Sequence, residues 1–205
     1  MHKEIFDRNQ FELLPIVKQF KKEFYLVGGT AVALHIGHRR SIDFDLFKFN
    51  PIKPKSIIDK IAESGYPYLV TRRVTEQLNV TVHNVKLTFY QYPFEVSSPV
   101  RLGDILRLPE LIDLAAMKAY ALGRRSKWKD YVDLYFILKD HFSIGQISEK
   151  AAFLFGQLFS EKLFRAQLCY YEDIDYTEQI EFIGTPVAAL DIRDFLTEKA
   201  TDLEV

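Results

Sequence analysis

The segment "VGGTAVALHIGHRRSIDFDLF", residues Val27–Phe47, decides how this chain is interpreted. An apolar run ends there at two glycines and a threonine, and a second run follows in which one phenylalanine separates two aspartates. Side chains alternate between the faces of a strand, so Asp43 and Asp45 should project from one face with Cβ atoms about 7 Å apart. Two carboxylates that close disfavour joint ionisation unless a cation lies near them.

A hard divalent cation satisfies that requirement. Mg²⁺ prefers oxygen ligands and is commonly held by one or two carboxylates together with substrate phosphates. Upstream, Gly28 and Gly29 at a strand end let the backbone approach a phosphate, and the free N–H groups that begin a helix over Thr30–Ile36 point toward it. A carboxylate pair beside a phosphate cradle indicates metal-assisted chemistry on a nucleoside triphosphate (NTP).

Length and composition limit the alternatives. The chain has 205 residues and 48% hydrophobic content, enough for a packed core in one large domain or a core with a smaller appendage. A net charge of −1 argues against wholesale coating of nucleic acid, although a local basic patch remains compatible with it. The single cysteine, Cys169, excludes an intramolecular disulfide and a cysteine-based zinc cluster. The N-terminus lacks the apolar segment of a signal peptide and no apolar run is long enough to span a bilayer, so we expect a cytoplasmic protein without a membrane partner.

The predicted secondary structure differs between the two halves of the chain. The sequence pattern of residues 1–100 predicts an α/β core with short buried strands and helices closed by glycine. It also predicts a tight turn at His83-Asn84 between two strands rich in Val, Thr and Tyr. Residues 101–205 predict a helical C-terminal portion, and no Gly/Ser linker separates the two. We therefore expect a mixed sheet with flanking helices, a helical portion packed on this core, and an active site between them.

A family resemblance follows from these residues. The array that carries it consists of Gly28-Gly29-Thr30, His38-Arg39, Ser41, Asp43 and Asp45. It resembles the signature of the nucleotidyltransferase superfamily and, more narrowly, of the AbiEii/AbiGii-type toxins of type IV toxin–antitoxin systems. The segment "DLAAMKAYALGRRSKWKDYVDLYFIL" supports the narrower match, since it places a lysine on one helix and Lys-Asp-x-x-Asp on the next. The resemblance covers about residues 24–138.

The resemblance implies roles for the residues of the first motif. Asp43 and Asp45 would hold the catalytic Mg²⁺ ions. The β- and γ-phosphates would lie against a set of small residues: Gly28, Gly29, Thr30 and Ser41. Arg39 would either pair with one aspartate or face phosphate.

The resemblance also implies roles for the second motif. Lys118 would neutralise triphosphate charge as a compact ammonium. Asp130, together with Asp133, would act near the attacking hydroxyl as a base or an orienting group. The alternative for Lys118 is a solvent-facing lysine, and for the two aspartates it is a pair of surface acids near a helix start.

Two further features bear on activity. Many superfamily members carry a third carboxylate on the strand that here reads "VKLTFYQYP", where alternation places Thr88 instead. The basic run "GRRSKWKD" suits an RNA end, because cations flank an aromatic side chain. Its alternative is a solvated turn between helices with Trp128 packed inward.

These observations predict an Mg²⁺-dependent nucleotidyltransferase that moves NMP from an NTP to an acceptor hydroxyl. The resemblance suggests RNA as the acceptor, with a tRNA 3′ end as one choice, and a toxin that a cognate antitoxin protein controls. The alternatives are nucleotidylation of a protein or small molecule, and a nucleotide-binding protein without transfer activity, which Thr88 favours.

Overall fold

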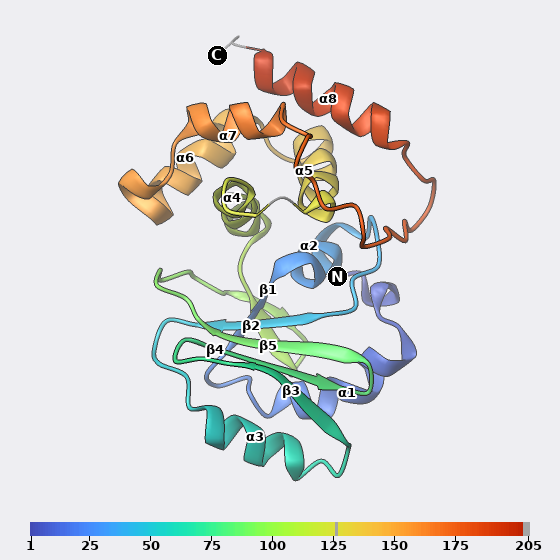
Figure 1. Cartoon of the computed structure of the whole chain (residues 1–205), viewed down its shortest axis with the longest axis vertical. Coiled ribbons are helices and arrows are strands. Elements are labelled where there is room, and N and C mark those ends of the chain that lie inside the picture. Colours follow the sequence, from blue (N-terminus) through green and yellow to red (C-terminus); the bar gives the residue numbers. More distant parts are fainter. Residues whose placement is uncertain (126, 203–205) are drawn as a thin grey trace. The chain divides into compact units, whose positions relative to one another are not determined.

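A computed structural model describes residues 1–125 and 127–202 of the chain. The chain forms two compact units, Met1–Glu110 and Leu111–Val205. Figure 1 shows the helices and strands of each unit.

The first unit combines a mixed sheet with helices. Its helical elements are η1 (Lys3–Ile5), α1 (Arg8–Lys18), α2 (Gly28–Ile36) and α3 (Pro54–Ala62). Its strands are β1 (Tyr25–Val27), β2 (Phe44–Lys48), β3 (Tyr68–Arg73), β4 (Gln77–Val82), β5 (Val85–Gln91), β6 (Val100–Leu102) and β7 (Leu106–Leu108). Within the described residues these seven strands form one sheet in the order β3-β4-β5-β2-β1-β7-β6. The pairs β1–β7 and β2–β5 are parallel and the other pairs are antiparallel.

One face of the sheet carries the hydrophobic core of this unit. Leu46 of β2 pairs with Phe89 of β5, both side chains are fully buried, and Leu78 of β4 continues the same row. The segment after α1 covers this row, since the rings of Phe20 and Phe24 lie 4.7 Å and 5.4 Å from that of Phe89, measured between centroids. Burial of these large rings is the main favourable term for the unit.

The other face of the same strands carries polar side chains. Asp45 lies beside Val27 of β1 and Thr88 of β5, and Thr88 in turn lies beside Asn79 of β4. Asp43 immediately precedes β2, and its Oδ2 atom lies 3.0 Å from Nζ of Lys86, a residue on the Asp45 side of β5, so the two carboxylates lie on the same side of the sheet. The predicted alternation is therefore confirmed for Phe44–Lys48, whereas the predicted strand is too long at its start, since Ile42 precedes β2 and is exposed instead of buried with Phe44 and Leu46.

The turns follow the predicted chemistry. His83 and Asn84 connect β4 to β5 with positive φ angles of 51° and 64°, which confirms the tight turn. Helix α2 ends at Gly37 in the left-handed conformation, as its sequence predicts. The same helix begins at Gly28, two residues earlier than predicted, so both glycines belong to its first turn.

The hairpin of β6 and β7 was not predicted. The sequence predicts a helical portion after Pro99, whereas Val100–Leu102 and Leu106–Leu108 extend the sheet beyond β1. Each strand has only three residues and one central arginine, which is too short for alternation to be distinguished from a loop.

The second unit is helical. It contains α4 (Leu111–Leu122), α5 (Trp128–Asp140), α6 (Ile144–Phe155), η2 (Gly156–Leu158), α7 (Glu161–Leu168) and α8 (Ala189–Thr201). Helices α4 and α5 confirm the two helices predicted from the sequence, and a capping box of Ser143 and Gln146 begins α6.

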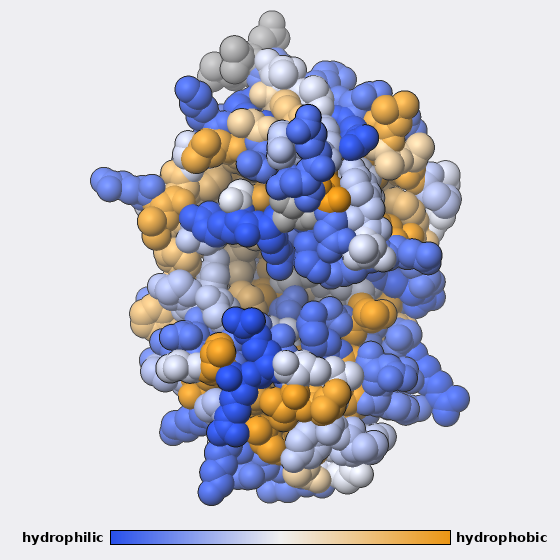
Figure 2. Space-filling view, in the orientation of Figure 1, coloured by the Kyte–Doolittle hydropathy of each residue, from blue (hydrophilic) through white to orange (hydrophobic). Residues whose placement is uncertain are grey.

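None of the helices within residues 1–125 and 127–202 combines the length and apolar character needed to cross a bilayer. The face in Figure 2 is mainly hydrophilic, with apolar side chains gathered in a few clusters.

Replacing Phe89 by alanine should lower the free energy of unfolding by about 3–5 kcal/mol, because it removes a buried ring and leaves a cavity between two others. The half-exposed Phe49 is the matched control, since its Phe49→Ala variant should lose less than about 1 kcal/mol. Urea unfolding followed by circular dichroism measures both variants. Equal losses would contradict the assignment of the core.

Candidate active site

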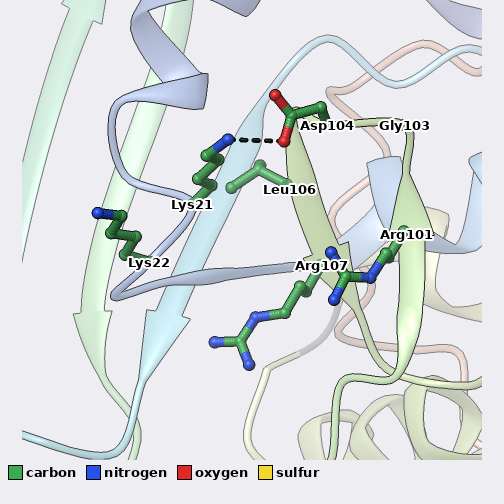
Figure 3. A pocket seen from close by; sticks show the side chains of 7 residues that line it. All are labelled: Lys21, Lys22, Arg101, Gly103, Asp104, Leu106 and Arg107. Atoms are coloured by element: carbon green, nitrogen blue, oxygen red, sulfur yellow. Dashed lines mark hydrogen bonds and ion pairs between the residues drawn. The ribbon is translucent and has the colours of Figure 1, made fainter.

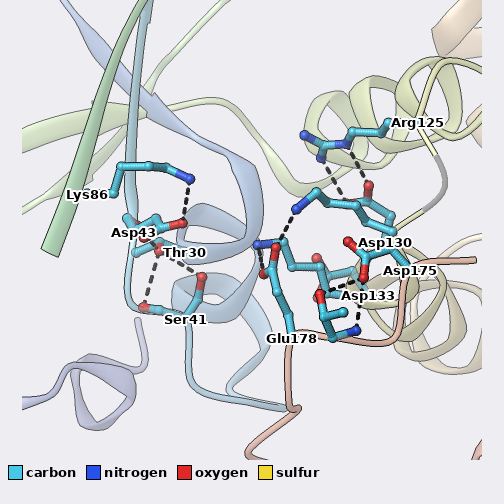
Figure 4. Close-up of polar contacts among 12 residues, drawn as sticks. Thr30, Ser41, Asp43, Lys86, Arg125, Asp130, Asp133, Asp175 and Glu178 are labelled. Carbon is cyan, nitrogen blue, oxygen red and sulfur yellow. Dashed lines mark hydrogen bonds and ion pairs between the residues drawn. The ribbon is translucent and has the colours of Figure 1, made fainter. Parts of the chain in front are cut away.

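The carboxylates of the first motif lie on the polar face of the sheet. The side chain of Asp43 is 23% exposed, and its Oδ2 atom lies 3.0 Å from Nζ of Lys86 on β5 (Figure 4). Lys86 precedes Thr88 by two residues and therefore projects from the same face as Asp45. A cation thus already relieves part of the repulsion between the two aspartates.

The glycines leave room for charged groups at the start of α2. Gly28 has a φ of +72°, and a Cβ atom on it would lie only 2.1 Å from Oδ2 of Asp45. A Cβ atom on Gly29 would lie 2.5 Å from Nη2 of Arg39 and 3.1 Å from Oγ of Ser41. Any larger residue would displace these groups, so the two glycines bring a carboxylate and a guanidinium against the helix N-terminus.

Thr30 holds the loop that leads to the aspartates. Its buried hydroxyl contacts Oγ of Ser41 at 3.0 Å and the backbone oxygen of Asp43 (Figure 4). Nε2 of Gln10 donates to the backbone oxygen of Ser41 at 2.8 Å, which supports the loop from α1. In this arrangement the Thr30 hydroxyl, predicted to contact phosphate, fixes Ser41 and Asp43 beside the glycines.

The donor set suits a magnesium ion that is completed by substrate. No group of three or more His, Cys, Asp or Glu side chains able to hold a metal occurs among residues 1–125 and 127–202. Two carboxylates on one face nevertheless fit Mg²⁺, which keeps several waters and takes further oxygens from phosphates. The position beside Asp45 on β5, where a third carboxylate would complete the protein ligands, holds the buried Thr88.

The residues of the second motif form a buried ionic cluster within the helical unit. Nζ of Lys118 on α4 lies 2.6 Å from Oδ1 of Asp130 and 2.5 Å from Oδ2 of Asp133, both on α5. The two aspartates are three residues apart on one side of α5 and are fully buried. Arg125 completes the cluster, with Nε and Nη2 at 2.7 Å and 3.0 Å from the oxygens of Asp130 (Figure 4).

Electrostatics keep Asp130 ionised. Burial alone raises the pKa of Asp130, but the charges of Lys118 and Arg125 outweigh burial and lower the pKa below its ordinary value. The cluster has one accessible member, since the side chain of Arg125 is 47% exposed while those of Lys118 and Asp130 are buried. The alternatives of a solvent-facing lysine and of surface acids are therefore wrong.

The basic run between α4 and α5 is engaged in internal contacts. Arg124 lies over the ring of Tyr120, with the guanidinium carbon 3.5 Å from the ring centroid. Lys127 and Lys129 both pair with Glu178, whereas Ser126 lies outside the described residues. Trp128 is buried, so the alternative with the tryptophan packed inward is confirmed.

Two of the side chains that shape these sites were not identified in the sequence. Lys86 had a detectable signal, because alternation in "VKLTFYQ" places it on the same face as Thr88. Glu178 had none, since about fifty residues separate it from the lysines that it contacts. Burial raises the pKa of Glu178, but hydrogen bonds from Lys127 and Lys129 outweigh it and lower the pKa to about 2.

Solved structures identify the class to which this fold belongs. A nucleotidyltransferase of Helicobacter pylori has a TM-score of 0.60 at 15% identity, over 94% of this chain and 91% of that one. The nucleotidyltransferase toxin MenT4 of Mycobacterium tuberculosis has a TM-score of 0.61 at 17% identity, over 95% and 82%. The chain therefore has a nucleotidyltransferase-like fold.

The sequence places the chain in a particular family. Residues 16–194 match the nucleotidyl transferase AbiEii toxin family of type IV toxin–antitoxin systems, and the chain belongs to that family. An uncharacterized protein of Aquifex aeolicus is 33% identical over 126 residues, which cover 58% of this chain. The match spans 59% of that relative's own length.

Gly28→Ala should abolish most activity by displacing the carboxylate of Asp45, and Gly65→Ala is its matched control. Both glycines have similar positive φ angles, +72° and +77°, but no atom lies within 4 Å of a Cβ at Gly65. Both variants should therefore lose about 1–2 kcal/mol of stability from backbone strain. Nucleotide transfer should fall only in Gly28→Ala, as measured at equal concentrations of folded protein. Equal transfer by the two variants would show that the close approach to Asp45 is unimportant.

Lys118→Met should lower the free energy of unfolding by about 3–5 kcal/mol at pH 7, because it leaves two buried carboxylates with one cation fewer. The exposed Arg8, paired with Glu12 on α1, is the control, and Arg8→Met should cost less than about 1 kcal/mol.

The pH dependence of this difference has a definite sign. The lowered pKa of Asp130 contributes stability to the wild type above its unfolded pKa, and this contribution is lost as the pH falls through the folded pKa. In Lys118→Met the buried carboxylate of Asp130 takes up a proton more easily. The difference in the free energy of unfolding between this variant and the wild type should therefore become smaller below about pH 4. A gap that widens on acidification, measured by urea unfolding, would contradict an ionised cluster.

Proposed function

We propose that the chain transfers a nucleoside monophosphate from an NTP to an acceptor hydroxyl in an Mg²⁺-dependent reaction. The observation that carries this proposal is the carboxylate of Asp45 packed against Gly28 at the N-terminus of α2, with Asp43 on the same face. Membership of the AbiEii toxin family supports it.

Asp43 and Asp45 are the residues that would hold the metal. Mg²⁺ bound there supplies positive charge that neutralises the phosphates and orients them for displacement. The backbone N–H groups at the start of α2 bind phosphate oxygens, which the helix dipole favours. Arg39, whose guanidinium lies against Gly29, adds a cation beside them, and Asp43, now paired with Lys86, would exchange that contact for the metal.

In the helical unit we assign Asp130 to orient the attacking hydroxyl indirectly, through the half-exposed Arg125 that it holds, because Asp130 itself is fully buried. Its lowered pKa makes it a weak proton acceptor, so orientation suits it better than general-base catalysis. Lys118 and Arg125 keep Asp130 ionised, and Asp133 helps to hold Lys118 in place. Lys118 contributes positive charge to the triphosphate jointly with the half-exposed Arg125, which is the member of the cluster that solvent reaches.

The acceptor that we propose is RNA, with a tRNA 3′ end as the first choice. The type IV toxin–antitoxin family supports a toxin in the cytoplasm whose activity a cognate antitoxin protein controls. Nucleotidylation of a protein or a small molecule is the alternative acceptor chemistry.

A second candidate function has one specific observation in its favour. Thr88 lies beside Asp45 in the sheet, at the place where a third carboxylate would assist a metal-dependent transfer. A chain that binds NTP and Mg²⁺ without turnover would account for that threonine. Calorimetry together with a transfer assay separates this candidate from the enzyme.

Replacing both aspartates, as Asp43→Asn/Asp45→Asn, should reduce transfer about a thousandfold, since loss of metal binding removes several kcal/mol of transition-state stabilisation. The assay incubates the full chain with labelled NTPs, Mg²⁺ and total tRNA, and follows label in the RNA, protein and small-molecule fractions. EDTA should reduce wild-type transfer to the same background.

The control is Asp59→Asn, which changes an exposed carboxylate on α3 and should leave transfer unchanged. Equal transfer by the wild type and the double variant would refute the catalytic proposal. Label outside the RNA fraction would select the alternative acceptor, and binding of NTP without transfer would select the second candidate.

A further inference from the structure

A basic pocket lies on the first unit, apart from the motif residues. It has a volume of about 310 Å³ (Figure 3). It is lined by residues of the segment after α1 and of the β6–β7 hairpin, namely Lys21, Lys22, Arg101, Gly103, Asp104, Leu106 and Arg107. Four of these seven residues carry a cationic side chain and one carries a carboxylate.

The single carboxylate is already matched by lysines. Asp104 lies 2.6 Å from Nζ of Lys21 and 2.9 Å from Nζ of Lys18. Hydrogen bonds from Lys21 and Lys18 lower the pKa of Asp104 to about 2, so it stays ionised near neutral pH. It orders Lys21 at the pocket but leaves the other cations uncompensated.

Three cations of the pocket have no such partner. Within residues 1–125 and 127–202, the side chains of Lys22, Arg101 and Arg107 make no ion pair or hydrogen bond. Arg101 and Arg107 are moreover directly opposite each other in the antiparallel β6–β7 pair. Like charges at opposed positions are destabilising, unless an anion lies between them.

The sheet register relates this pocket to the aspartates. Arg107 pairs with Tyr25 of β1, which pairs with Phe47 of β2, two residues from Asp45. Paired residues share a face of the sheet, so Arg107 projects from the same face as Asp45. The spacings between strands and along them put the two Cα atoms about 12 Å apart.

We propose that this pocket binds the phosphate backbone of the RNA acceptor, an inference that rests on the proposed function. Two unpaired guanidinium groups suit phosphodiester oxygens, because each offers a planar pair of N–H donors. A short stretch of RNA spans the distance from the pocket to the carboxylates. The basic run between α4 and α5, the earlier candidate for this contact, instead directs its cations at internal partners.

Binding of fluorescently labelled total tRNA to the full chain tests the proposal, in EDTA and without NTP. Arg101→Ala/Arg107→Ala should reduce the slope of log affinity against log salt by about 1.4, the value for two lost contacts to a single strand. That slope corresponds to about 25-fold weaker binding at 0.1 M salt, relative to an unchanged affinity at 1 M. Arg101→Lys/Arg107→Lys keeps both charges and should retain most of the affinity.

The matched control removes two exposed lysines at the start of α3, as Lys53→Ala/Lys55→Ala. Helix α3 packs near β3, at the opposite edge of the sheet from β6, so this variant should bind RNA like the wild type. Equal losses in the control and the arginine variant, or no loss in either, would overturn the proposal. Thermal unfolding of each variant shows whether a loss of RNA affinity comes from misfolding. If the alanine variant misfolds, the RNA affinity and salt dependence of Arg101→Lys/Arg107→Lys test the proposal instead.

Calorimetry with ATP and Mg²⁺ separates RNA from free phosphates as the ligand. The arginine variant should bind the nucleotide like the wild type. Lost nucleotide affinity with unchanged RNA affinity would assign the pocket to the triphosphate and refute the proposal. If the wild type binds RNA through these arginines but transfers no nucleotide, the proposed function is wrong and the assignment of the pocket stands. If the wild type transfers label to RNA but the arginine variant binds RNA with unchanged affinity, only the assignment of the pocket is wrong.

Discussion

The carboxylate of Asp45 occupies the space that a side chain at residue 28 would need, and the candidate active-site end of the sheet is organised around this approach. The left-handed backbone of Gly28 turns the chain directly from β1 into α2, which aims the first N–H groups of the helix at the same place. Thr30 then ties the returning loop to the helix, so Asp43 and Asp45 enter β2 at a fixed position. Carboxylates and helix N-terminus thus lie together because of backbone geometry, before any ligand contributes.

The helical unit contains a buried ionic cluster. Three side chains of its motif, Lys118, Asp130 and Asp133, are buried, and a buried charge persists only when it is paired. Their mutual contacts join α4 to α5 and leave Arg125 as the accessible cation. A motif that signals catalysis in the sequence is therefore also a structural requirement, and loss of activity in a variant there has to be separated from loss of folding.

Much of this arrangement could be predicted from local patterns. Alternation around Asp43 and Asp45, the turn at His83-Asn84 and the helices on either side of the basic run each depend on a few adjacent residues. The β6–β7 hairpin was missed because a strand of three residues has too little periodicity. Pairings between distant segments, such as Glu178 with Lys127, follow from tertiary packing that no local pattern encodes. Which motif residues are exposed and which are buried against one another has the same origin.

The arginines of the hairpin have another consequence, which follows from the place of β6 at the end of the strand order. A terminal strand exposes unused backbone donors and acceptors, and other chains can add to it as a further strand. Arg101 at the centre of β6, and Arg72 and Arg73 on β3 at the far end, put charge on both borders. The same guanidinium groups that we assign to ligand binding thereby also help to keep the protein from aggregating.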